Sequence, residues 1–170
     1  MNTRTGRIVF DVPVVLIELL YWREALDLDV APDMPPAAPV VEHTPAPDGA
    51  ADRWRQAYAS LVDQFEHDAL KPGWVALDGG GDRPAHELPA LARAWVNEQR
   101  QRVIDDALTS SKQNGPRVYR RGQSLAAEPI THVLVLPVVG HYSARPTTRV
   151  LVTSLDTFLD DAAWATAIAS

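Results

Sequence analysis

The chain has 170 residues, of which 46% are hydrophobic and 22% charged, and it contains 14 prolines and no cysteine. This length allows one hydrophobic core without covalent cross-links, so we expect a single domain over residues 1–170. The lack of cysteine excludes disulfide scaffolds, thiolate metal sites and cysteine nucleophiles. A net charge of −6 argues against a dedicated nucleic-acid-binding protein, which normally carries a basic surplus.

The N-terminal segment has two arginines before an apolar run, which is one feature of a signal peptide. Asp11, Glu18, Arg23 and Glu24 interrupt that run, and no small-residue cleavage site follows it. Its uncharged stretches are far shorter than the ~20 residues that span a bilayer. We therefore expect a soluble, cytoplasmic protein without membrane association.

Residues 6–10 are predicted as a short strand, and residues 12–26 as a helix that is apolar on nearly every side. Asp11 is the expected N-cap of this helix, and Pro13 falls in its first turn, where a missing N–H costs nothing. A strand over residues 12–26 is the competing interpretation, because valine and isoleucine are stiff and favour strands.

Residues 27–50 contain six prolines between Pro32 and Pro47. Proline prevents a continuous helix or a central strand here, so we predict a mobile, extended insertion at about residues 29–50. The prolines near Pro39 have no neighbouring Lys or Arg to orient docking on an SH3-like domain, which makes a linker the preferred interpretation.

Residues 51–70 show the clearest helical pattern, with an apolar stripe at intervals of three and four residues. A second long helix is expected over residues 87–109. Its apolar face begins with Leu91 and Trp95 among others, and Gln99 and Arg102 interrupt it. The stripe of the first helix is formed by Trp54, Tyr58, Leu61, Phe65 and Ala69. Four tryptophans fall in four different expected helices, which predicts a core with helices packed on a sheet.

Residues 131–139 and 149–153 are apolar runs of strand length, separated by a segment with Gly140 and Pro146. We interpret them as an antiparallel hairpin in which Pro137 marks a bulge or an edge strand. A final helix follows Asp160, its expected N-cap. The predicted fold class is α+β, with three to four helices packed on a small antiparallel sheet that contains this C-terminal hairpin.

Few residues suggest chemistry. His141 and Ser143 are weak catalytic candidates, because a serine near a histidine is typical of hydrolases, but no G-x-S-x-G motif is present. Asp63 and His67 share one helix face, yet two ligands do not make a metal site, and His132 is expected to be buried and hydrogen-bonded. We expect no metal and no cofactor.

One basic cluster is present. It comprises Arg117, Arg120 and Arg121 with Tyr119 between them, and Arg145 is a further candidate for binding an anion. The leading hypothesis is a non-enzymatic cytoplasmic accessory protein that binds another protein. The alternatives are a small hydrolase or transferase using His141 and Ser143, and an anion or nucleic-acid binder using Arg117 to Arg121.

Overall fold

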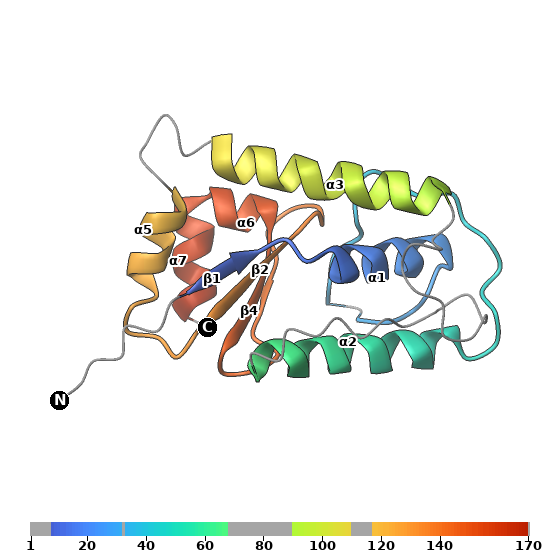
Figure 1. The fold of residues 1–170 in the computed structure, drawn as a ribbon, viewed down its shortest axis with the longest axis horizontal. Coiled ribbons are helices and arrows are strands. Elements are labelled where there is room, and N and C mark those ends of the chain that lie inside the picture. The colour runs from blue at the N-terminus through green and yellow to red at the C-terminus, as the bar shows by residue number, and fades with distance from the viewer. Residues whose placement is uncertain (1–7, 32, 68–89, 110–116, 170) are drawn as a thin grey trace.

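A computed structural model describes residues 8–31, 33–67, 90–109 and 117–169, and Figure 1 shows the elements along the chain. In chain order they are β1 (Val9–Asp11), α1 (Val14–Ala25), α2 (Ala50–Glu66), α3 (Ala90–Thr109), α5 (Arg117–Ser124), β2 (His132–Leu136), β3 (Ser143–Ala144), β4 (Val150–Ser154), α6 (Leu155–Leu159) and α7 (Asp161–Ala169).

The four strands form one mixed sheet in the order β1-β2-β4-β3. β1 pairs with β2 and β2 with β4, both in parallel, whereas β3 is antiparallel to β4. The α+β class is confirmed, but the predicted antiparallel hairpin of residues 131–139 and 149–153 is wrong. After β2 the chain crosses to the edge of the sheet and forms β3. It then turns back into β4, which lies between β2 and β3 and runs in the same direction as β2. Pro137 lies just beyond β2, which is a central strand.

The central strands β2 and β4 are buried on both faces, which explains their near-continuous apolar runs. Alternate residues of these strands point to opposite sides, as the pleat requires. Leu134, Leu136 and Val152 pack into a core with α1 and α2. Val133, Val135 and Leu151 pack into a second core whose members include side chains of α3, α6 and α7.

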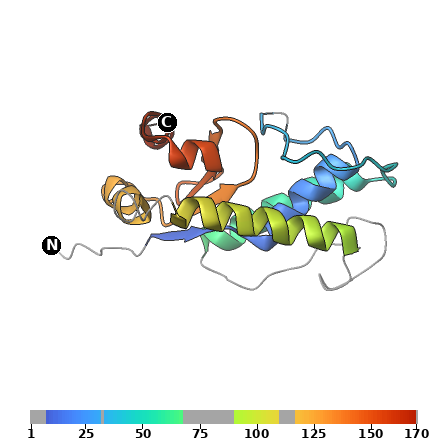
Figure 2. The same cartoon turned by 90° about the horizontal axis from the view of Figure 1, so that it is seen from above.

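The described part of the chain contains six helices, which is more than the three to four predicted. In Figure 1, α1 lies between α2 and α3, and these three helices extend away from the sheet. Figure 2 shows α5, α6 and α7 gathered at the opposite end of the molecule. The sequence did not reveal α5, which is strongly polar, or α6, which has only five residues.

Helix α1 confirms the helical interpretation of residues 12–26. Its N-cap is Pro13, whose side chain cannot cap, and not Asp11 as expected. Asp11 ends β1, and its Oδ1 accepts a hydrogen bond from the backbone N of Val12 at 2.7 Å. The carboxylate therefore stabilises the turn between β1 and α1. The expected cap at Asp160 is confirmed, because its Oδ1 accepts from Ala163 N at 2.7 Å.

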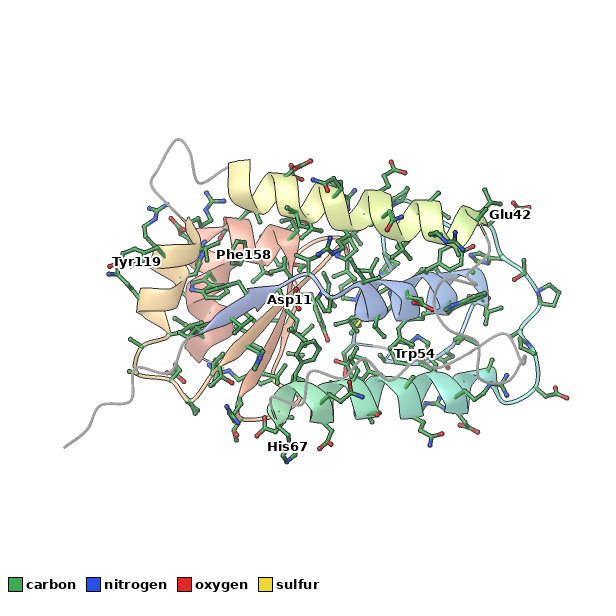
Figure 3. The ribbon with its side chains drawn as sticks, viewed as in Figure 1. Asp11, Glu42, Trp54, His67, Tyr119 and Phe158 are labelled. Carbon is green, nitrogen blue, oxygen red and sulfur yellow. The ribbon has the colours of Figure 1, made fainter. Side chains whose placement is uncertain are left out.

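Trp54 shows how α2 is held against α1. It is only 1% exposed, stacks on Tyr58, and donates its indole N–H to the backbone oxygen of Leu19 at 2.6 Å. Figure 3 places it between the two helices. The predicted stripe is thus the core face of α2 as far as Phe65, while Ala69 lies outside the described residues.

Part of the proline-rich segment packs against the core, and the mobility of the segment stays a prediction. Met34 and Ala37 are buried in the core that includes α1 and α2. Arg23 of α1 donates hydrogen bonds to the backbone oxygens of Met34, at 3.1 Å, and Pro35, at 2.6 Å. The segment is therefore attached to α1 by apolar and polar contacts together.

Candidate functional site

The predicted basic cluster lies on α5, where its members point in different directions. Tyr119 is 62% exposed and projects away from the molecule in Figure 3, and Arg120 is also exposed. Arg117 is half-buried. Arg121 is buried, so the four residues do not present one continuous basic surface.

Arg121 is held by three residues of the C-terminal helices. Its Nε and Nη2 donate to the backbone oxygen of Phe158 at 3.1 and 2.9 Å, and its Nη2 pairs with Asp161 at 2.8 Å. The guanidinium also lies 5.0 Å from the ring centroid of Trp164. Desolvation lowers the pKa of Arg121, with Asp161 acting in the opposite sense. These contacts attach α5 to α6 and α7.

The loop of His141 and Ser143 is anchored through the residue between them. The backbone N of Tyr142 donates to Ser154 Oγ at 3.1 Å and to Thr157 Oγ1 at 2.9 Å, where α6 begins. His141 is exposed, and within the described ranges no hydrogen bond joins its imidazole to the Ser143 hydroxyl. The arrangement explains how the loop is positioned and supplies no nucleophile–base pair.

Arg145, the remaining predicted binding residue, contacts its own chain. It pairs with Glu128 at 3.4 Å and donates a hydrogen bond to the backbone oxygen of Ile168. It therefore connects the loop after β3 to the end of α7. His132 is buried as expected, with its Nδ1 3.1 Å from Thr131 Oγ1 and its ring packed on Phe65.

A different surface combines two exposed apolar side chains with three half-buried aromatic ones. It lies where α1, α3 and the proline-rich segment meet, and we call it the aromatic patch. It consists of Tyr21, Trp22, Val40, Leu91 and Trp95. Val40 is 88% exposed and Leu91 is 78% exposed, the highest fractions among the large exposed hydrophobic residues of the described chain.

The aromatic patch has a defined geometry. Tyr21 lies 5.7 Å from Trp95 and 5.4 Å from Trp22, measured between ring centroids. Trp95 donates its indole N–H to the backbone oxygen of Pro39 at 3.3 Å, which places Val40 beside it. Leu91 is one helical turn before Trp95 on the same face of α3. The hydrogen bond to Pro39 therefore connects Trp95 of α3 to the proline-rich segment next to Val40.

Carboxylates surround this end of the molecule. Residues 27–50 contain Asp27, Asp29, Asp33, Glu42 and Asp48, all of them exposed, and no Lys or Arg. Glu42 lies near the first turn of α3 in Figure 3. The pKa of Tyr21 is raised, chiefly by desolvation and further by the charge of Glu42. The aromatic patch thus adjoins a negatively charged segment.

A buried carboxyl group lies on the same two helices. Glu18 of α1 and Gln99 of α3 are both buried, and Glu18 Oε2 and Gln99 Oε1 have no hydrogen-bond partner among the described residues. Desolvation raises the pKa of Glu18 to about 7. Gln99 was expected to weaken the burial of its helix, but it is 1% exposed.

Sequence reasoning missed the aromatic patch because it assigned Leu91 and Trp95 to a core-facing stripe. The signal was present in Leu91, Trp95 and the apolar Val40 of the proline-rich segment, but periodicity does not distinguish a buried stripe from an exposed one. Only the packing of α1 against α3 determines which side chains stay at the surface.

Within the described ranges no group of three or more His, Asp or Glu side chains is placed to hold a metal ion. None of the helices described is long and apolar enough to cross a membrane. No protein-family model, curated protein or solved structure matches the chain.

Proposed function

We propose that this chain is a non-enzymatic, cytoplasmic interaction protein that binds another protein through the aromatic patch. The observation that carries the proposal is the exposure of Val40 and Leu91, at 88% and 78%: Val40 follows Pro39, to which Trp95 is hydrogen-bonded, and Leu91 is one helical turn before Trp95. Contiguous exposed apolar surface is costly in water and commonly marks a site of association.

The composition of the aromatic patch supports this proposal. Tryptophan and tyrosine are enriched at protein interfaces, because they offer a large apolar area together with one polar group. Tyr21 and Trp95 contact each other, and the Trp95 N–H is already bonded to Pro39. Little side-chain entropy is then lost when a partner covers them.

The charges nearby indicate the chemistry of the partner. The proline-rich segment offers exposed carboxylates and no cation, so it would attract Lys and Arg side chains. We therefore expect the partner to present an apolar segment flanked by basic residues. The apolar contact would supply most of the affinity, and the charges would raise the association rate.

The test compares four baits and one control bait in extracts of the native cell, with quantitative mass spectrometry of the retained proteins. The baits are the native protein, Val40→Ser, Leu91→Ser and the double variant. Tyr119→Ser is the matched control, because it removes another exposed side chain at the opposite end of the molecule. Circular dichroism and gel filtration of each bait establish that the fold and the oligomeric state are unchanged.

The proposal predicts that one protein is retained by the native and Tyr119→Ser baits and is lost from the double variant. The purified pair should then bind more weakly as salt is raised, because the carboxylates are screened. Equal capture by the native and double-variant baits would contradict the proposal. Gel filtration showing self-association that V40S/L91S abolishes would assign the aromatic patch to a second copy of this chain.

A further inference from the structure

A cavity of about 340 Å³ lies beside the carboxyl end of β1 and shares no lining residue with the aromatic patch. The apolar part of its lining comes from both sheet and helices, and includes Phe10, Ile104, Val118, Val135 and Phe158. Figure 3 labels Phe158 and Asp11 at this end of the sheet. The cavity lies over the sheet face that packs against α3 and α6, next to the carboxyl end of β1.

Two charged side chains complete the lining, Asp11 from the end of β1 and Arg100 from α3. Asp11 uses Oδ1 for the backbone N of Val12, and Arg100 uses Nε for the backbone oxygen of Val12 at 3.2 Å. Within the described residues the two are not joined in an ion pair, and neither the second carboxylate oxygen nor the terminal guanidinium nitrogens have another partner. The cavity is therefore apolar with one unpaired charge of each sign.

This combination selects among ligands by charge. A ligand with a carboxylate alone would pair with Arg100 but be repelled by Asp11. A ligand with an amine alone would pair with Asp11 but be repelled by Arg100. A ligand that carries both charges close together satisfies both side chains. An apolar group on the same ligand would pack against the apolar lining, which includes Phe10 and Phe158, two rings that contact each other edge to face at 5.9 Å.

We propose that this cavity binds a free α-amino acid with an apolar side chain. The ammonium group would contact Asp11, the carboxylate would contact Arg100, and the side chain would enter the apolar cavity. The volume is at the lower end of the ~300–1,000 Å³ range of small-molecule sites, which suits a ligand of this size better than a nucleotide.

Binding is tested by isothermal titration calorimetry of the whole chain with L-leucine, L-methionine and L-phenylalanine. The best of these is compared with two analogues on the unaltered protein, one lacking the ammonium group and one lacking the carboxylate. For phenylalanine the analogues are 3-phenylpropionate and phenethylamine. We expect saturable binding of at least one amino acid and a loss of tenfold or more in affinity for both of its analogues.

Three variants locate the binding. Asp11→Asn and Arg100→Gln should each weaken binding at least tenfold, because each removes one of the two charges while keeping polar groups. Ala107→Phe should abolish it by filling the cavity, whose lining includes Ala107. Asp52→Asn and Arg55→Gln are the matched controls, since these residues form an exposed ion pair on α2 and should leave affinity unchanged.

The proposal is overturned if no amino acid binds saturably, or if the analogues bind as well as the amino acid. The analogue series needs no variant, so it decides the question even if Asp11→Asn does not fold. The Val40→Ser, Leu91→Ser double variant should bind the amino acid as the native protein does. Failure of the cavity proposal is therefore distinguishable from failure of the proposed interaction surface.

Discussion

Replacing Glu18 by Gln should change how the stability of this protein depends on pH. Burial raises the pKa of the Glu18 carboxyl from 4.5 to about 7 in the folded state, so folding takes up a proton between these values. The contribution of Glu18 to the free energy of unfolding is therefore most favourable below about pH 4.5 and is lost as the pH rises to about 7. Above that pH the contribution no longer changes. At about 1.4 kcal/mol for each pKa unit, the loss is about 3 kcal/mol.

The assay is urea unfolding, followed by tryptophan fluorescence at pH 5 and pH 8.5 for the native protein and Glu18→Gln. The amide does not titrate, so the difference in unfolding free energy should shift by about 2.5 kcal/mol in favour of the variant from pH 5 to pH 8.5, because part of the loss has already occurred at pH 5. Glu98→Gln on the exposed side of α3 is the control and should show no such shift. If the difference in unfolding free energy between the native protein and Glu18→Gln changes by less than ~0.5 kcal/mol from pH 5 to pH 8.5, the assignment of a buried, protonated carboxyl group is refuted.

Three further predictions concern stability, and each is measured by the same urea titration. Trp54→Ala should cost about 3–5 kcal/mol, because it empties a filled core site; a loss under ~1 kcal/mol would contradict the position of Trp54 between α1 and α2. Arg121→Ala should cost about 2–4 kcal/mol by leaving the Phe158 carbonyl unpaired, whereas Arg120→Ala should stay within ~0.5 kcal/mol. Equal losses for the two arginines would be incompatible with the inward orientation of Arg121. Ser154→Ala should cost about 1–2 kcal/mol, since Ser154 Oγ caps α6; an unchanged unfolding midpoint would argue against that cap.

The helices with strong periodicity were predicted well, and the short or polar ones were not. The stripe of Trp54, Tyr58 and Phe65 has the spacing of one helix face, and the structure buries Trp54 and Phe65 on it. Helix α6 gives no such signal, because five residues complete little more than one turn. Its existence depends on Ser154, whose hydroxyl accepts from the N–H of Thr157 only after β4 has brought the chain to this point.

The sequence showed which residues have side chains suited to binding, but it did not show where those side chains lie in the fold. Arg120 and Arg121 are adjacent in sequence, so a basic cluster was a natural hypothesis, but successive residues of a helix point about 100° apart. Arg120 consequently faces solvent while Arg121 enters the contact with Phe158 and Trp164. Asp11 and Arg100 were not predicted as a pair, because 88 residues separate them and only the fold places both beside one cavity.

The sequence by itself determined the core face of α2, the burial of Trp54 and Trp164, and the two apolar strands, because each follows from spacing between neighbours along the chain. The direction of the strands was decided only by the tertiary structure. An apolar run such as residues 132–136 shows that both faces of a strand are buried, but antiparallel and parallel partners can both provide that burial. The return of the chain through β3 makes β2 and β4 parallel. The same long-range packing leaves Val40 and Leu91 at the surface, where no local pattern had placed them.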